Sequence, residues 1–373
     1  MTQDRPDSPD AHAAPRRRLL IVTDGLANGG IERQLTLLVK ALPELWDVRV
    51  VSLADGVYAP ILRGLGIPVS VFARRFRLDV SPAFPIAGFI RSWRPTVVHC
   101  FGWMSTAACA IPCKLGHVPL VDATIQDGAL PPRRGRVMRF MTSLADVVIA
   151  NSRAGLEAFG VDPARGRVVY NGFDPERWAL CQGGHRAERP TTVVMTARMH
   201  PHKDYRTFLE AARILSAEDP GGWRFLAVGS GDGRAALLAE YDDMIRSGAV
   251  AFPELGTEVL GAVRDSSIGV LLTNAAVHAE GLPNSVMEYM ACALPVVVTG
   301  TGGNPELVLE GETGLLVPPG DVSAVVDALR RLRDDPVAAE RMGRAGRERI
   351  ATVFTVDALV AGTVAAYELA IGG

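Results

Sequence analysis

Two glutamates, Glu280 and Glu288, stand eight residues apart, where a turn that holds glycine and proline leads into an expected helix. Glu280 on the turn can reach the hydroxyls of a sugar, and Glu288 inside the helix can accept hydrogen bonds from two ribose hydroxyls. Asn284 can cap that helix, and free amides at its start can face a diphosphate. The pattern is therefore suited to binding a diphosphate-linked sugar. The alternative is that one glutamate is simply solvated and the other only interacts favourably with the helix dipole.

Two cations, Arg198 and Lys203, stand five residues apart on a loop that follows an expected strand at residues 192–196. Fixed positive charge on such a loop can stabilise negative charge without proton transfer. Two solvated cations on a polar loop are the alternative. Gly303 lies in a glycine turn, where the lack of a side chain permits close approach to the main chain.

These residues must be positioned by the elements around them. Short aliphatic runs alternate along the chain with turns that hold glycine or asparagine and with amphipathic helices. Expected strands lie at residues 18–23, 48–53, 69–72, 96–99, 120–124, 147–150, 167–170, 192–196, 224–228, 249–252, 268–272, 295–299 and 314–317. Expected helices lie at residues 31–42, 59–65, 135–143, 205–216, 233–246, 258–264, 284–291, 322–333 and 355–371. Continuous apolar strands that alternate with helices predict an α/β fold with two doubly wound parallel sheets.

The chain has 373 residues, which is more than one hydrophobic core usually supports, so two domains are expected. A glycine-rich polar stretch without periodicity indicates the linker between them. We expect a disordered lead-in at 1–15, a first domain at 16–175, a linker at 176–189, a second domain at 190–353 and a terminal helix at 354–373 that packs back on the first domain.

Composition argues against several classes of protein. A formal net charge of −2 argues against nucleic-acid binding by phosphate neutralisation. No apolar run reaches the length of a membrane-spanning helix, and the polar N-terminus does not read as a secretory signal. The five cysteines lie in apolar surroundings, which predicts buried reduced thiols and a cytoplasmic location.

The segment at residues 278–298, HAEGLPNSVMEYMACALPVVV, resembles the paired-glutamate motif of the retaining glycosyltransferases of family 4. Further landmarks of that family are matched at residues 29–33, 196–212, 225–233 and 301–306. The resemblance extends from about Leu19 to the C-terminus. It implies the GT-B fold, in which two Rossmann-like doubly wound domains face a central cleft.

The resemblance also implies a role for each of these residues. Glu288 would bind the donor ribose and Glu280 would contact the donor sugar. Arg198 and Lys203 would hold the leaving diphosphate, so the implied catalytic residues are Arg198, Lys203 and Glu280. The implied donor-binding residues are Gly30, Gly281, Leu282, Asn284, Glu288, Gly303 and Asn304, of which the last two would close over the sugar.

One departure from the family concerns Gln126. Many members carry a histidine that faces the donor sugar after the strand equivalent to residues 120–124, and this chain has glutamine there, followed by Asp127. Glutamine donates and accepts hydrogen bonds but does not titrate. Gln126 and Asp127 are therefore expected to face the sugar or the acceptor, with no titrating group at the position of the histidine.

The implied activity is retaining transfer of a hexose-type sugar from a UDP- or GDP-linked donor to a hydroxyl group. The acceptor would be a glycan, a lipid-linked molecule or a small molecule. No Asp-x-Asp occurs in the chain, so neither a metal ion nor a cofactor is expected. A nucleotide-sugar epimerase of the same fold and a non-catalytic nucleotide-sugar-binding protein are the alternatives.

Arginine clusters at residues 74–77 and 133–139 leave three interpretations open. They can contact anionic lipid headgroups at the inner face of a membrane, bind an anionic acceptor, or form a plain solvated surface.

Overall fold

The computed structural model describes residues 16–27, 29–76, 79–131, 134–182, 190–254 and 259–373. The expected lead-in at 1–15 and much of the expected linker, residues 183–189, lie outside these ranges. Arg77 and Arg133 of the two arginine clusters lie outside them as well.

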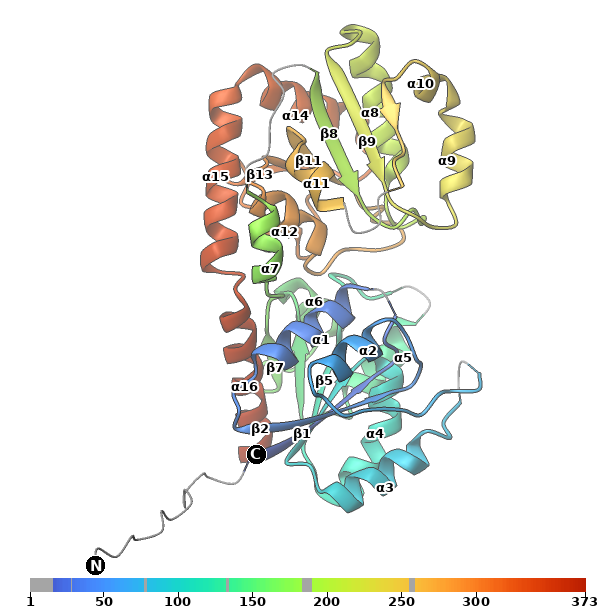
Figure 1. Cartoon of the computed structure of the whole chain (residues 1–373), viewed down its shortest axis with the longest axis vertical. Coiled ribbons are helices and arrows are strands. Elements are labelled where there is room, and N and C mark those ends of the chain that lie inside the picture. The colour runs from blue at the N-terminus through green and yellow to red at the C-terminus, as the bar shows by residue number, and fades with distance from the viewer. Residues whose placement is uncertain (1–15, 28, 77–78, 132–133, 183–189, 255–258) are drawn as a thin grey trace, which may run out of the picture. The chain divides into compact units, whose positions relative to one another are not determined.

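The first sheet contains seven strands among the described residues, in the order β3-β2-β1-β4-β5-β6-β7. The strands are β1 (Arg17–Thr23), β2 (Trp46–Ser52), β3 (Val69–Val71), β4 (Val97–Phe101), β5 (Leu120–Ile125), β6 (Val147–Ala150) and β7 (Gly166–Val168). The helices between them are α1 (Gly30–Ala41), α2 (Tyr58–Gly64), α3 (Ala83–Trp93), α4 (Trp103–Gly116), α5 (Gly135–Thr142) and α6 (Arg153–Phe159). Leu19, Leu20, Ile21 and Val22 are fully buried, because helices cover both faces of a central parallel strand. Figure 1 shows β1 beside its parallel partner β2.

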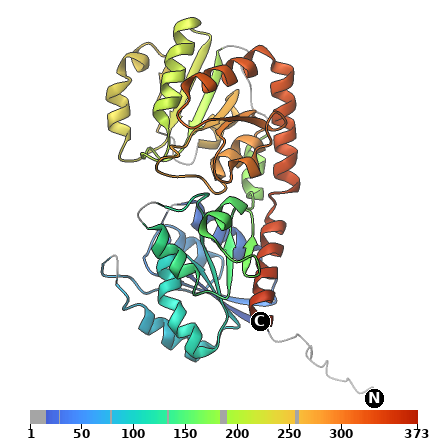
Figure 2. The same cartoon turned by 180° about the vertical axis from the view of Figure 1, so that it is seen from behind.

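The second sheet contains six strands among the described residues, in the order β10-β9-β8-β11-β12-β13. The strands are β8 (Thr191–Thr196), β9 (Trp223–Val228), β10 (Val250–Ala251), β11 (Ile268–Leu271), β12 (Val296–Thr299) and β13 (Gly314–Val317). The remaining helices are α7 (Pro175–Leu180), α8 (Tyr205–Glu218), α9 (Arg234–Glu240), α10 (Asp242–Arg246), α11 (Val259–Arg264), α12 (Asn284–Ala291), α13 (Asn304–Leu307), α14 (Val322–Asp334), α15 (Pro336–Thr352) and α16 (Val356–Gly372). The helices α8 and α14 pack against each other, as the view from behind in Figure 2 shows. Every strand expected from the sequence is present, and the α/β fold with two parallel sheets is confirmed.

One prediction of local structure was wrong. The expected helix at 233–246 is divided into α9 and α10, because the backbone of Tyr241 leaves the helical conformation (φ −115°, ψ 24°) while its ring is buried. The first part of the expected linker forms the short helix α7. Pro175 starts that helix, and the Asp174 side chain caps it by accepting a hydrogen bond from the Glu176 amide over 2.9 Å.

The described chain divides into two compact units. Unit 1 holds the described residues up to Ala123 together with Leu144–Val147 and Ala366–Gly373. Unit 2 holds Thr124–Ser143 and Val148–Ala365, and it therefore contains the whole second sheet. The domain boundaries expected from the sequence stay predictions.

The end of α16 belongs to unit 1 and packs into its core. Tyr367 is fully buried, with its hydroxyl 2.8 Å from Nδ1 of His99 and its ring 5.3 Å from the ring of Trp46. Burial lowers the pKa of His99 to about 3, so this ring is neutral at pH 7. All five cysteines are buried and free, as expected from the sequence.

Among the described residues, no single helix is long and apolar enough to cross a membrane. The neighbouring helices α15 and α16 meet this criterion only as a pair, and they are bent by 42° where they join.

Candidate active site

The carboxyl ends of β8 and β11 form the switch point of the second sheet, because the strand order runs outward from them in opposite directions. Open α/β sheets bind ligands at such points. The loop after β8 crosses to β11 here, where the Asp204 amide donates to the Leu272 carbonyl over 2.9 Å. The preceding residue, Lys203, forms an isolated antiparallel bridge with Thr273. Lys203 is therefore held at the end of β11.

Lys203 forms an ion pair with Glu280, the first of the two glutamates. Its Nζ lies 2.5 Å from Oε1 of Glu280, and both side chains are only 12% exposed. Burial opposes the ionisation of Glu280, but Lys203 and His278 outweigh it and lower the pKa of Glu280 to about 2. The switch point therefore holds a carboxylate that is ionised at neutral pH and can accept hydrogen bonds from hydroxyls.

The imidazole of His278 lies between two carboxylates. Its Nε2 is 3.5 Å from Oε1 of Glu280, and its Nδ1 is 3.6 Å from Oδ1 of Asp127. Burial acts to lower the pKa of His278, but the two carboxylates outweigh it and raise that pKa above its ordinary value. Burial raises the pKa of Asp127, opposed by the charge of His278 and supported by that of Glu280. We call Lys203, Glu280, His278 and Asp127 the charged group.

Glycines bring loop backbones into close contact around Glu280. A Cβ on Gly281 would lie 2.2 Å from Oδ1 of Asn151 and 2.4 Å from the carbonyl oxygen of Gln126. A Cβ on Gly303 would lie 2.0 Å from the carbonyl oxygen of Gly281, so both positions require glycine. The Gly303 amide donates to the carbonyl of Glu280 over 2.8 Å. That amide thus donates its hydrogen bond within the protein, and contact of Gly303 with a sugar donor stays a prediction.

Glu288, the second glutamate, is buried in α12 and paired with Arg177 of α7. Its Oε1 lies 2.8 Å from Nη2 of Arg177, and the two side chains are 8% and 26% exposed, respectively. The next residue, Tyr289, anchors α12 to the end of β8, because its hydroxyl accepts a hydrogen bond from the Thr196 amide over 2.6 Å. Glu288 is therefore held by a helix that is fastened to the switch-point strand β8.

The prediction that Asn284 caps α12 was wrong. The cap position is occupied by Pro283, whose backbone is extended (φ −74°, ψ 122°), and Asn284 is the first helical residue. Proline fits this position because its fixed φ suits the extended residue that precedes the helix. The side chain of Asn171 donates to the Leu282 carbonyl over 2.9 Å and to Oδ1 of Asn284 over 3.4 Å. Asn171 thus stabilises the start of α12.

Three further predicted residues, Asn304, Arg198 and Gly30, also lie outside the charged group. Asn304 is 1% exposed, and its side chain donates to the Thr299 carbonyl over 2.7 Å, which fastens α13 to the end of β12. Arg198 is exposed on the loop after β8, and Gly30 is the first residue of α1 in unit 1. The contacts of these residues with a donor stay predictions.

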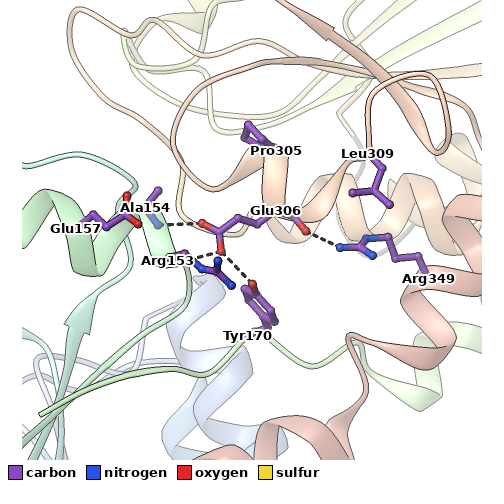
Figure 3. Close-up of a pocket in the computed structure, with 8 residues that line it drawn as sticks. All are labelled: Arg153, Ala154, Glu157, Tyr170, Pro305, Glu306, Leu309 and Arg349. Carbon is purple, nitrogen blue, oxygen red and sulfur yellow. Dashed lines mark hydrogen bonds between the residues drawn. The ribbon is translucent and has the colours of Figure 1, made fainter. Parts of the chain in front are cut away.

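A pocket of about 340 Å³ lies beside α13 in unit 2 (Figure 3). It is lined by Arg153, Ala154, Glu157, Tyr170, Pro305, Glu306, Leu309 and Arg349. Oε2 of Glu306 accepts hydrogen bonds from the Arg153 amide (2.8 Å) and the Tyr170 hydroxyl (3.0 Å). Its Oε1 accepts one from the Ala154 amide (2.9 Å). Both carboxylate oxygens are thus satisfied by the protein.

Sequence reasoning missed two residues that the structure brings to the two glutamates. His278 stands two residues before Glu280, and side chains two apart share a face in extended chain, so this spacing was the available signal. Arg177 meets Glu288 across more than a hundred residues of sequence, and no local pattern indicates it.

Two known protein families match consecutive parts of this chain. "Glycosyltransferase Family 4" matches residues 28–177, and "Glycosyl transferases group 1" matches residues 190–335. The chain is 28% identical over 297 residues to a glycogen synthase of Mycobacterium tuberculosis, a match that covers 75% of this chain and 70% of that protein. It is 31% identical over 290 residues to a D-inositol 3-phosphate glycosyltransferase of Mycobacterium avium, covering 70% of this chain and 65% of that protein.

Among solved structures, HepE of Anabaena in complex with UDP has a similar fold, with a TM-score of 0.80 at 21% sequence identity. The similarity covers 93% of this chain and 98% of HepE. Two Rossmann-like parallel sheets together with these matches define a class of enzyme. The chain is a glycosyltransferase of the GT-B type.

Proposed function

We propose that this chain is a retaining glycosyltransferase of family 4 that moves a hexose-type sugar from a nucleotide diphosphate donor to a hydroxyl group. The observation that carries the proposal is the ion pair of Lys203 and Glu280 at the switch point of the second sheet. Lys203 provides a fixed cation for a leaving diphosphate, and Glu280 provides a carboxylate that accepts hydrogen bonds from hydroxyl groups.

Within this proposal, different residues bind different parts of the donor. Lys203 and Arg198 hold the diphosphate, and Glu280 orients the sugar. Glu288 accepts hydrogen bonds from the ribose, with Arg177 as its partner when no donor is bound. As the bond to the sugar breaks, the charge on the diphosphate grows, so the two cations act most strongly on the transition state.

We propose a UDP- or GDP-linked donor, and the names of related structures support the UDP-linked form. Structures similar to this chain include complexes of HepE with UDP and with UDP-glucose. The curated relatives include an inositol phosphate glycosyltransferase and a mannosyltransferase. We propose a glycan, a lipid-linked molecule or a small molecule as the acceptor, and a cytoplasmic location. Contact of the arginine clusters with anionic lipid, and activity without a metal ion, are further parts of the proposal.

A panel of UDP- and GDP-sugars tests the donor. Thermal shift identifies the sugar that binds, and incubation with and without acceptors follows its fate. Transfer with an unchanged anomeric configuration, observed by proton NMR, is the expected result. Conversion of the donor alone to another sugar would indicate an epimerase. Binding without slow hydrolysis or transfer would indicate a non-catalytic binding protein.

A further inference from the structure

His278 contacts two residues that are proposed to face the sugar, and it has no role in the mechanism described so far. We infer that His278 is a positioning residue of the transfer reaction: its imidazolium, held between Asp127 and Glu280, fixes the orientation of the Glu280 carboxylate toward the donor sugar. The inference rests on the proposed role of Glu280 in sugar transfer.

The backbone on both sides of His278 is anchored. The His278 amide donates to the Asn274 carbonyl over 3.0 Å, and the Asn274 amide donates to the His202 carbonyl over 3.0 Å. Two residues further on, Glu280 forms an isolated antiparallel bridge with Asp127. The ring of His278 lies beside the carboxylates of both residues.

The charge of the two carboxylates favours the protonated ring. The two nitrogens of His278 lie 3.5 Å and 3.6 Å from carboxylate oxygens of Glu280 and Asp127. An imidazolium is attracted by both carboxylates, whereas a neutral imidazole carries no charge for them to attract. Two flanking carboxylates therefore stabilise the protonated ring. The raised pKa of His278 agrees with this, since the carboxylates outweigh the effect of burial.

The other groups that face His278 come from the loop after β8. The ring of His202 packs edge-on at 5.1 Å, His200 and His202 approach within 2.6 Å at their Nδ1 atoms, and Lys203 adds positive charge. Burial, followed by the charges of Lys203 and His278, lowers the pKa of His202 to about 4. His202 is therefore neutral at pH 7, whereas His278, with its raised pKa, keeps its proton to higher pH.

The position of the two cations has a consequence for Glu280. Lys203 and His278 both contact Oε1, which leaves Oε2 to accept a hydroxyl of the donor sugar. When His278 loses its proton, Asp127 and Glu280 face each other without a cation between them. Glu280 is then held by Lys203 alone, and its orientation is less well defined.

The direction of the pH dependence follows from the raised pKa of His278. The protonated ring persists above about pH 6.5, the ordinary histidine value, and is lost as the pH rises through the raised value. Turnover that depends on the imidazolium is therefore fully present at lower pH and falls on the alkaline side.

Three variants test the inference by steady-state kinetics across the neutral and alkaline range, with whichever of UDP-glucose and GDP-mannose the wild-type protein uses. We expect H278Q to lower kcat about 10- to 100-fold, because misplacing a reacting group by ~1 Å costs ~10²-fold. The donor KM and the affinity for the free nucleotide should change little, and the alkaline fall should disappear. H278K keeps a permanent charge and should restore part of kcat at alkaline pH. H200Q, a change at an exposed ring, should keep the wild-type profile.

NMR titration of the histidine rings in the full chain gives a readout that needs no donor. The signal absent in H278Q identifies His278, whose pKa should lie above about 6.5 and should fall in D127N. A ring pKa at or below that value, or H278Q with wild-type kcat and pH profile, would overturn the inference while transfer by the wild-type protein stood. If the wild-type protein transfers no sugar from any UDP- or GDP-sugar of the panel, the proposed function itself is wrong.

Discussion

Glu280 and Glu306 are two carboxylates of unit 2 that follow the neighbouring strands β11 and β12, and they are held in different ways. Glu280 is held by side chains that carry charge, Lys203 and His278. Glu306 is held by two backbone amides at the start of α6 and by the hydroxyl of Tyr170. Burial and the nearby Glu306 raise the pKa of Tyr170, so this hydroxyl stays neutral.

The difference separates a carboxylate available for chemistry from one used for structure. Both contacts of Glu280 are made by Oε1, so its second oxygen can meet a ligand. Both oxygens of Glu306 accept hydrogen bonds from the protein, although a pocket opens beside it (Figure 3). A carboxylate in a pocket is therefore not by itself evidence of a binding site. The identity of its partners is more informative than its exposure.

The largest effect on kcat is expected at Lys203, the partner of Glu280. Lys203→Ala should lower kcat by about 10²–10³, the typical loss when one preorganised electrostatic donor is removed. The donor KM should change less, because the cation acts most on the charge of the transition state. Arg198→Ala should act likewise, and Arg198→Lys should recover only part, since a point charge lacks the planar fork of guanidinium.

Steady-state kinetics with the donor found by thermal shift, or rates of donor hydrolysis, would measure these effects. Arg206→Ala is the matched control, because Arg206 is an exposed cation three residues away that pairs with Glu240. Wild-type turnover in Lys203→Ala would show that Lys203 is not part of the catalytic site. It would also remove the contrast between Glu280 and Glu306.

A smaller effect is expected at the buried pair of Glu288 and Arg177. Glu288→Ala should weaken binding of UDP or GDP by about 1.5–3 kcal/mol, the range for a hydrogen bond to a charged group. Calorimetry on the free nucleotide measures this. Arg177 is 26% exposed, so water can solvate it in the variant, and circular dichroism checks that the fold is kept. Unchanged nucleotide affinity in a folded variant would exclude Glu288 from the donor site.

Glu306 should matter for stability more than for turnover. Glu306→Ala leaves two amides at the start of α6 without their acceptor and should lower the free energy of unfolding by about 1–2 kcal/mol, as other lost helix caps do. Tyr170→Phe removes only one hydrogen bond and should cost about 0.5–1.5 kcal/mol. Urea unfolding measures both variants. A loss of kcat as large as that of Lys203→Ala, with normal stability, would show that Glu306 belongs to the chemistry.

No effect is expected from chelation. If Lys203 and Arg198 stabilise the leaving diphosphate, excess EDTA should leave kcat unchanged. Activity that is lost with EDTA and restored by manganese or magnesium would mean that a divalent ion, not these cations, meets the developing charge.

The sequence alone determined the elements of the fold, because each depends on local patterns. The apolar run at 18–23 became β1, and the amphipathic stretch at 205–216 became α8, since periodicity and burial act over a few neighbouring residues. The same holds for the two glutamates and for Lys203, which stand in segments that can be recognised without a structure. Residue 241 is an exception, because its backbone leaves the helical conformation within an otherwise continuous helical pattern.

Only the tertiary structure decided which residues hold the glutamates. Asp127 meets His278 because loops at the ends of strands from both sheets come together within unit 2, and their spacing in the sequence contains no sign of this. The same is true of Arg177 and Glu288, since a buried carboxylate needs a cation but does not specify where in the chain that cation lies. Ion pairs depend on distances of a few ångströms in space. Strand order sets those distances, and strand order is a property of the whole fold.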